Sequence, residues 1–423
     1  MVPKIVLLVA LAAITVNARR APHADYIESL FKANNGGRFS SDILEDSLLD
    51  APGLVAKYGY PIEIHHVTTS DGYILEMHRI PHGRDEHNTR DPSKPIAFIM
   101  HGLLSSSADF IVKGPGNALA YVLAEAGYDV WLGNARGNYY SRDHLTLKPD
   151  SNINQNFWKF SWDEIGNFDL PAFIDYILET TGQSKLHYLG HSQGGTTFLV
   201  LNSLRPEYNE KFISFQGLAP ASFMDNNDVS MFQSLAPFEN VIESTAYLLG
   251  YGEVFGDRDF ITEFKANYCG EGSIFTELCS STITGLNERE FYNSTMVPLF
   301  LAHAPAGASI RQIAHYGQVI KFEAFRRYNH NSLTNLIVYG SRNPPPYDLS
   351  KVTAPSYLHY GASDKEVNYR DLHNLASKLP NVVGKYRIER ETFNHYDFIW
   401  GIDARQVLYD KLITLMKDAE SRL

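Results

Sequence analysis

The 423-residue sequence is 44% hydrophobic and 20% charged, which is typical of a globular protein with a sizeable core. Its formal net charge is −11, and the Lys and Arg residues are dispersed along the chain. No basic segment indicates a nucleic-acid-binding surface, and we interpret the acidity as a source of solubility.

The first 18 residues have the pattern of a secretory signal peptide. Lys4 supplies the positive start, residues 5–16 form an apolar core, and residues 16–18 form a small-residue cleavage site. A signal anchor is the alternative, but this apolar run is shorter than a bilayer requires, and no later run reaches that length. We therefore expect a secreted chain without a transmembrane segment, with delivery to the lysosome as the alternative.

The segment that follows, residues 19–57, is polar with scattered apolar positions. It fits either a propeptide or a segment that wraps the surface, and the sequence leaves both open. Two β-rich runs, residues 63–69 and 73–80, flank Ser70-Asp71-Gly72 and predict a hairpin.

Beyond the hairpin, short apolar runs alternate with helical patterns. Continuous apolar runs are typical of strands buried on both faces of a parallel sheet. Ser161 and Glu164 form a capping-box pattern that opens one of the helices. The predicted strands are residues 95–100, 128–132, 186–189 and 212–218, and the predicted helices are residues 117–126 and 161–181.

The alternation predicts the α/β class with a doubly wound, mostly parallel sheet and right-handed crossovers. It resumes late in the chain with a strand (356–360), a helix (368–379), a strand (382–390) and a helix (402–417). In the interval it is replaced by mainly helical and irregular patterns, including a helix-like stretch at 310–328. The predicted organisation is a core in two parts, residues 58–220 and 347–423, with an inserted cap or lid domain at residues 221–346.

The cap contains both cysteines, Cys269 and Cys279. We expect them to pair in an oxidising compartment, and two free buried thiols are the alternative. Asn293 begins an Asn-Ser-Thr glycosylation acceptor, which is consistent with export. The histidines show no i, i+4 pair with an acid, so we expect no metal and no cofactor.

The stretch that organises the chain is Gly190-His-Ser192-Gln-Gly194, between the strand at 186–189 and a helical run at 196–204. Gly-x-Ser-x-Gly at a strand-to-helix turn is the nucleophile elbow of α/β-hydrolases. The serine occupies a sharp, strained turn, and larger side chains at positions 190 and 194 would crowd it. The alternative is a glycine-rich turn with an ordinary serine.

A serine hydroxyl is a weak nucleophile that needs a base within hydrogen-bond reach and an acid behind that base. In α/β-hydrolases the chain order is serine, acid, histidine. Asp364 follows the predicted strand at 356–360, and His395 follows the last predicted strand, so these are the candidate acid and base. Both could instead be ordinary loop residues. Three other acids fit less well: Asp348 precedes the strand, Asp371 lies within the helix, and Asp397 shares the loop of His395.

The oxyanion of an acyl-transfer reaction needs two preorganised backbone N–H groups. Gln193 supplies one from the elbow, and Leu103 is the candidate for the other because it follows the first buried strand. We interpret His101 and His191, which flank these positions, as structural residues rather than as direct participants.

Several stretches together make the sequence similar to the animal acid lipase family, which includes gastric and lysosomal acid lipases. The resemblance runs from about residue 58 to the C-terminus and is weakest in the cap. The stretches are Lys57-Tyr-Gly-Tyr-Pro61, Asp71-Gly-Tyr-Ile-Leu-Glu-Met-His-Arg-Ile-Pro81, His101-Gly-Leu-Leu104, Ala126-Gly-Tyr-Asp-Val-Trp-Leu-Gly-Asn134, Arg136-Gly-Asn138, Lys185-Leu-His-Tyr-Leu-Gly-His-Ser-Gln-Gly194, Pro305-Ala-Gly307 and Asn394-His-Tyr-Asp-Phe-Ile-Trp400.

The resemblance implies an α/β-hydrolase core with a cap and lid. It places the family triad on Ser192, Asp364 and His395, and the oxyanion hole on Leu103 and Gln193. The cysteine pair falls in the region where the family carries a disulfide. Two departures, Gly195 in place of threonine and the polar Ser105-Ser-Ser107, are candidates for tuning acyl-chain preference.

These observations predict a secreted, monomeric serine lipase that hydrolyses acyl esters, such as triacylglycerols or cholesteryl esters, at a lipid–water interface through an acyl-enzyme. The apolar cap would cover the site in water and open at lipid. A carboxylesterase for dissolved substrates would use the same residues. A non-catalytic lipid-binding protein would be favoured by a missing triad member, and none is missing. The triad also permits a serine peptidase, against which the family resemblance argues.

Overall fold

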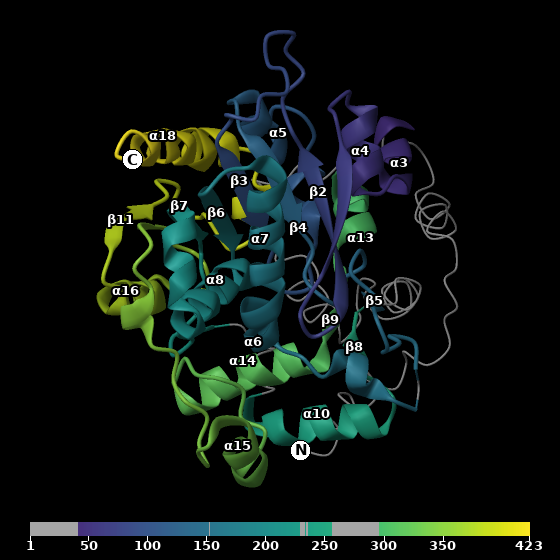
Figure 1. Ribbon diagram of the computed structural model, residues 1–423, viewed down its shortest axis with the longest axis vertical. Helices are drawn as coiled ribbons and strands as arrows, with labels where there is room; N and C mark the ends of the chain where they lie inside the picture. Colours follow the sequence, from purple (N-terminus) through teal and green to yellow (C-terminus); the bar gives the residue numbers. More distant parts are fainter. Residues whose placement is uncertain (1–40, 152, 229–232, 234–235, 256–295) are drawn as a thin grey trace.

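The computed structural model describes residues 41–151, 153–228, 233, 236–255 and 296–423. Its centre is a nine-stranded sheet with helices on both faces (Figure 1). The strand order is β1-β2-β4-β3-β6-β7-β10-β11, with β5 paired to β2. The strands are β1 (Glu63–Thr68), β2 (Tyr73–Ile80), β3 (Ile96–Met100), β4 (Asp129–Gly133), β5 (Asp143–His144), β6 (Leu186–His191), β7 (Phe212–Leu218), β10 (Ser356–Tyr360) and β11 (Val382–Arg387).

The pairing is parallel from β4 to β11, and β2 is antiparallel to both β1 and β4. Every residue of β3, β4, β6 and β7 is buried, which explains why these strands are mainly apolar in the sequence. Of the four, β3 is an unbroken apolar run, whereas the others also bury polar residues such as Asp129, His187 and Gln216. The edge strand β1 instead alternates half-buried and exposed residues. The predicted α/β class, the mostly parallel sheet and the hairpin at Asp71 are confirmed.

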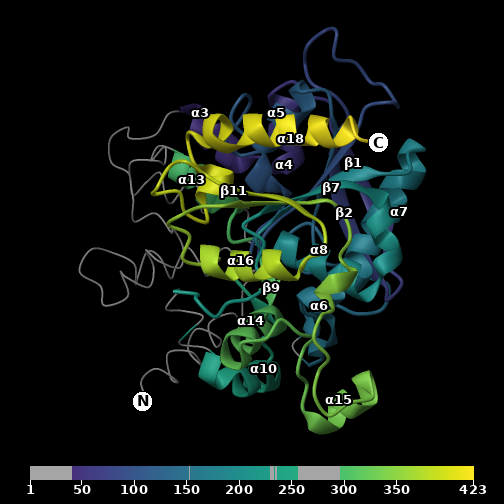
Figure 2. The ribbon, with the colours of Figure 1, turned by 90° about the vertical axis from the view of Figure 1, so that its left-hand side faces the viewer.

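Helices α5 (Leu119–Glu125) and α18 (Asp410–Glu420) cover one face of the sheet, and α8 (Gln193–Leu204) and α16 (Tyr369–Lys378) cover the other (Figures 1 and 2). The predicted capping box forms, because Ser161 Oγ accepts from the following turn and Glu164 accepts from Ser161 N at 2.7 Å. The helix then runs from α6 (Trp162–Glu164) through one π-helical turn into α7 (Leu170–Thr181), where Gly182 ends it with φ 68°.

Four predicted boundaries were wrong. The helical run expected at 196–204 is α8, which begins at Gln193. The helix expected at 310–328 is α14 (Ile310–Phe322), because Glu323 adopts a left-handed φ of 49° and stops it. The strand expected at 382–390 ends at Arg387. The last helix begins later than residue 402, because Gly401 ends the short α17 (Asp397–Trp400) and the chain must turn before a π-helical turn at 405–409 leads into α18.

Part of the N-terminal segment lies on the surface of the core. Helices α3 (Ser41–Leu48) and α4 (Ala51–Lys57) precede the sheet, and α3 packs against α13 (Val297–His303). Asp50 caps α4 by accepting from Gly53 N at 2.7 Å. Residues 41–57 therefore wrap the surface, whereas residues 19–40 and the predicted signal peptide lie outside the described residues.

The described part of residues 221–346 is mainly helical. It contains α10 (Glu239–Leu248), β8 (Glu253–Val254), α13, β9 (Ala308–Ser309), α14 and α15 (Ser332–Tyr339). The two cysteines, Cys269 and Cys279, and the glycosylation acceptor Asn293 lie outside the described residues. None of the helices in the described ranges has the length and apolar character needed to cross a membrane.

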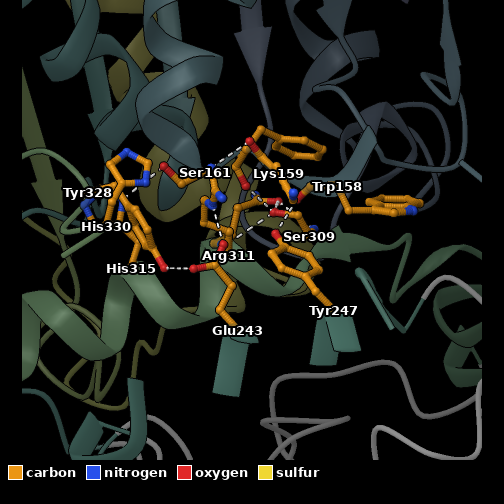
Figure 3. Close-up of polar contacts among 12 residues, drawn as sticks. Trp158, Lys159, Ser161, Glu243, Tyr247, Ser309, Arg311, His315, Tyr328 and His330 are labelled. Carbon is orange, nitrogen blue, oxygen red and sulfur yellow. Dashed lines mark hydrogen bonds and ion pairs between the residues drawn. The ribbon is translucent and has the colours of Figure 1, made fainter. Parts of the chain in front are cut away.

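Polar side chains hold α10, β9 and α14 to the core at three successive backbone carbonyls (Figure 3). Tyr247 OH donates to the carbonyl of residue 158 at 3.0 Å, Arg311 Nη1 to that of residue 159 at 2.8 Å, and Ser309 Oγ to that of residue 160 at 2.5 Å. The Arg311 guanidinium also pairs with Glu243 at 2.5 Å, which joins α14 to α10. The other labelled groups include His315, which bonds Ser161, and Tyr328, which bonds Glu243.

The buried guanidinium of Arg136 links the turn of the hairpin to the helical turn before α7. Arg136 follows β4 and contacts both oxygens of Asp71 in the hairpin turn, at 2.6 and 2.8 Å. Its Nε donates to the fully buried Asp169 at 2.7 Å, and the guanidinium lies over the Tyr73 ring. Burial raises the pKa of Asp169 to about 6, against the opposing charge of Arg136. The ion pair with Arg136 therefore stabilises the ionised form of Asp169 inside the protein.

We predict that Arg136→Met destabilises the fold by about 3–5 kcal/mol at pH 7, because it leaves a buried carboxylate without its partner. Without Arg136 the folded-state pKa of Asp169 rises further above its unfolded value, so the penalty is complete above the folded pKa and shrinks as the pH falls through it. Urea unfolding followed by tryptophan fluorescence should therefore show a smaller loss at pH 5 than at pH 7. Adding Asp169→Asn should recover part of the stability, and a loss that is equal at both pH values would contradict this account.

Candidate active site

Ser192 sits on a strained turn between β6 and α8. Its φ of 51° and ψ of −116° lie in a region that side chains rarely adopt. Ser192 N donates to Leu218 O at 2.9 Å, while its carbonyl accepts from the N–H groups of Gly195 and Thr196. Hydrogen bonds on both sides thus hold the backbone in the strained geometry expected of a nucleophile elbow.

The glycines of the motif are required by space. A Cβ on Gly194 would lie 2.3 Å from Met100 O, and a Cβ on Gly190 would lie 2.6 Å from the carbonyl carbon of Gly194. A Cβ on Gly195 would lie 2.4 Å from Pro220 Cβ. The steric reason predicted for residues 190 and 194 is therefore confirmed, and it extends to Gly195.

His395 and Asp364 lie together, as their positions after two neighbouring strands suggested. His395 Nδ1 and Asp364 Oδ2 are 2.9 Å apart, and both side chains are buried. Burial by itself lowers the pKa of His395, but the charge and hydrogen bond of Asp364, together with the charge of Glu366, raise it above its ordinary value. Within the described residues no hydrogen bond joins Ser192 Oγ to His395, and such contacts commonly tighten only when substrate is bound.

Two close backbone contacts bring these loops together. A Cβ on Gly361 would lie 2.2 Å from Phe393 O, so the loop of Asp364 can touch the loop of His395 only because residue 361 has no side chain. His191, next to the nucleophile, donates from Nε2 to His395 O at 3.0 Å, and the two rings are 4.8 Å apart. The elbow is thereby bonded directly to the histidine loop.

The backbone N–H groups of Leu103 and Gln193 are the candidates for the oxyanion hole. In the described parts of the chain, neither N–H donates a hydrogen bond. The loop of Leu103 lies against the elbow, since a Cβ on Gly102 would lie 3.2 Å from Ser192 Cβ. The next residue, Leu104, has φ 60°, and its carbonyl accepts from Ala306 N at 2.7 Å. Both N–H groups are therefore available beside Ser192.

His101 fixes the loop that carries Leu103. Its Nδ1 lies 2.8 Å from Gly102 O, and its Nε2 accepts from Ala135 N at 3.1 Å, which defines a neutral ring with the proton on Nδ1. Burial lowers the pKa of His101 to about 4. Burial and the neighbouring His395 also hold the pKa of His191 well below its ordinary value. Both contacts fit the structural roles predicted for these two histidines.

The competing acids have other partners. Asp348 is exposed and accepts from Ser350, and Asp371 is buried and accepts from Asn226 N and Nδ2. Asp397 accepts from Asn394 N and pairs with Arg390, which supports the histidine loop from within. Of the four acids considered, Asp364 is the one that contacts His395.

Two groups near the site were missed from the sequence. Ala306 N supports the oxyanion loop, and the only signal was its place in a family-like stretch, Pro305-Ala-Gly307. Glu366, two residues after Asp364, has a carboxylate close to the His395 ring. The sequence shows a second acid two positions after Asp364, but no pattern in it indicates where the side chain of that acid lies.

Comparison with known proteins places this architecture in a family. The model described as the alpha/beta hydrolase fold matches residues 98–402, and the one described as the partial alpha/beta-hydrolase lipase region matches residues 52–114. The chain belongs to the α/β-hydrolase lipases. It is 43% identical to Lipase 1 of Drosophila melanogaster over 89% of this chain and 81% of that protein. It is 36% identical to gastric triacylglycerol lipase of Bos taurus, over 88% and 92% of the two chains.

A further relative is lysosomal acid lipase/cholesteryl ester hydrolase of Homo sapiens, at 33% identity over 92% of this chain and 96% of that protein. Among solved structures, DcsB in complex with its substrate analogue matches with a TM-score of 0.51 at 12% identity, covering 85% of this chain and 99% of that chain. This likeness concerns the fold. The membership in a lipase family makes the protein a serine ester hydrolase, as the elbow and the resemblance predicted.

The two departures from the family pattern have structural explanations in this lipase. Gly195 faces Pro220, where a side chain has no room. The serines after the oxyanion loop are buried and bonded internally: Ser105 to Asp109, Ser106 to the N–H of residue 108, and Ser107 to His78. These contacts give all four residues packing or hydrogen-bonding roles, and an effect on acyl-chain preference stays a prediction.

The role of the hydrogen bond from His191 to His395 O can be tested by substitution. We predict that His191→Phe lowers kcat for ester hydrolysis by about ten- to a hundred-fold with little change in KM, because the histidine loop loses the bond that sets its position. His191→Gln, which can still donate to His395 O, should recover most of the activity. Steady-state kinetics on a dissolved ester, with circular dichroism to show folding, would measure both. Equal losses in the two variants would show that the hydrogen bond is not the cause.

Proposed function

We propose that this lipase hydrolyses the carboxylic esters of water-insoluble acyl lipids, with triacylglycerols as the first candidate and cholesteryl esters as the second. The single observation that carries the proposal is the Asp364–His395 pair at 2.9 Å, held over the elbow of Ser192 by the His191 bond. The gastric triacylglycerol lipase and the lysosomal acid lipase/cholesteryl ester hydrolase among its relatives support this substrate class.

In the proposed mechanism Ser192 Oγ attacks the ester carbonyl carbon, and His395 Nε2 takes its proton. Asp364 accepts from His395 Nδ1 and stabilises the imidazolium that forms. The N–H groups of Leu103 and Gln193 bind the oxyanion of the tetrahedral intermediate. His395 then gives its proton to the leaving alkoxide, and a water molecule activated by the same histidine hydrolyses the acyl-enzyme.

The same proposal includes the location and the working state of the protein. A signal peptide and a disulfide between Cys269 and Cys279 fit a secreted enzyme, or one delivered to the lysosome. Glycosylation at Asn293 fits both destinations. We propose that the protein works as a monomer at a lipid–water surface, with residues 221–346 as the cap that selects the substrate.

We predict that purified protein releases fatty acid from a long-chain triacylglycerol emulsion. Ser192→Ala should lower kcat by at least about 10⁴-fold, because the nucleophile is lost while the fold is kept. A pH-stat assay of the emulsion, beside a dissolved short-chain ester, measures both activities. Activity only on the dissolved ester would make the protein a carboxylesterase, and a folded protein silent on both would leave lipid binding as its role.

A further inference from the structure

The loop that carries Asp364 places a second carboxylate beside the same imidazole. Oxygen atoms of Asp364 and Glu366 and a ring nitrogen of His395 lie within 4.8 Å of one another. Asp364 is bonded to the Nδ1 side of the ring, whereas Glu366 is partly exposed. The proposed base of this lipase is therefore flanked by two acids rather than one.

We propose that Glu366 is a positioning residue that acts through His395: its carboxylate stabilises the protonated imidazole and sets the lowest pH at which His395 is a free base. The inference rests on the proposed function, because it assigns Glu366 a role that acts through the proposed base His395. Glu366 would thereby help to determine the pH range in which the enzyme is active, which the composition and motifs of the sequence do not reveal.

Hydrogen bonds hold the backbone around Glu366 on both sides. Asp364 Oδ1 accepts from Val367 N at 2.8 Å, which closes a turn through Glu366. Asn227 Nδ2 donates to Glu366 O at 2.8 Å, and Asp228 N donates to Lys365 O at 3.0 Å. The segment that leads into the cap thus fixes the same loop from outside.

The charges facing this pair act in opposite directions on the pKa of Glu366. Burial raises the pKa of Glu366, the charge of His395 lowers it, and the charge of Asp364 raises it again. Lys365 is exposed and adds a weak positive charge. Burial also raises the pKa of Tyr396, with Glu366 and Asp364 adding to the shift, so this phenol stays neutral.

His191, the remaining titratable neighbour of His395, has a pKa well below its ordinary value because of burial, so it too stays neutral. Near the ring, the two carboxylates are thus the groups that favour the charged imidazole. Asp364 does so through a hydrogen bond, which also orients the ring. Glu366 does so through its charge, which is the property that a substitution can remove without disturbing that bond.

The test is Glu366→Gln, which keeps the size of the side chain and removes its charge. Loss of a nearby negative charge destabilises the imidazolium, so the pKa of His395 falls and the histidine remains a free base to lower pH. The acidic limb of the kcat/KM profile should therefore move down by about 0.5 to 1.5 pH units, for a carboxylate at this separation in a partly solvated site.

Two further variants separate charge from structure. Glu366→Asp keeps the charge and should return the acidic limb most of the way to its wild-type position. Glu179→Gln makes the same charge change at an exposed position of α7 and should leave the profile unchanged. An acidic limb that stays at the wild-type pH in folded Glu366→Gln, or one that moves equally in Glu179→Gln, would overturn the proposal.

A direct measurement keeps the inference independent of the assay. The His395 imidazole can be titrated by NMR in protein labelled with ¹⁵N-histidine, in the Ser192→Ala background, with and without Glu366→Gln. A lower His395 pKa in the double variant supports the role of Glu366 even if no tested ester is hydrolysed, and an unchanged pKa refutes it. Loss of the lipase activity alone would count against the proposed function and leave this result standing.

Discussion

The site of this lipase depends on backbones that approach one another more closely than any side chain would permit. Gly194 lies against the carbonyl of Met100, and Gly361 lies against the carbonyl of Phe393. The first contact joins the elbow to the oxyanion loop, and the second joins the acid loop to the histidine loop. Because parallel strands end at the same edge of the sheet, these two contacts suffice to collect four loops around Ser192. A methyl group at either position would separate loops that have to cooperate.

Three histidines lie in this small space, and their partners give them different properties. His101 contacts a backbone carbonyl and a backbone amide, and His191 donates to a carbonyl. Neither has a carboxylate partner in these contacts, and burial keeps both neutral. His395 alone of the three is bonded to a carboxylate, and its pKa is raised. The proton in the proposed mechanism is thereby directed to one ring, while the other two serve as fixed hydrogen-bonding groups.

The sequence predicted those parts of the molecule that depend on local patterns. Mainly apolar runs located the buried strands to within a residue or two at each end, because burial on both faces favours apolar side chains. The capping box at Ser161 was visible because both partners lie within one turn. Glycine spacing and strand order made Ser192 the candidate nucleophile, and their positions after two strands made Asp364 and His395 the candidate acid and base.

What the sequence could not predict depends on contacts between distant segments. Asn227 bonds the loop of Glu366 across 139 positions, and no pattern in either segment indicates the other. The helix boundary at Glu323 was missed because a left-handed residue other than glycine or asparagine has no sequence signature. The mostly parallel sheet with its helices could thus be inferred from periodicity, whereas the contacts that support the site depend on the folded arrangement of distant segments.

The contacts at residues 158–160 limit how the cap can move. An opening that lifted α10 and α14 away from the core would strip three successive carbonyls of the donors from Tyr247, Ser309 and Arg311. The Ser309 bond is buried, the Tyr247 bond is partly buried and the Arg311 bond is exposed. Water would replace the lost donors on opening, so each bond stabilises the closed arrangement by about 0.5–1.5 kcal/mol. The opening of the predicted cap at lipid stays a prediction, and these three bonds are among those that a movement of α10 and α14 would break. The bond from Asn227 to the backbone of Glu366 adds a further tie, between the beginning of the same segment and the loop of Asp364.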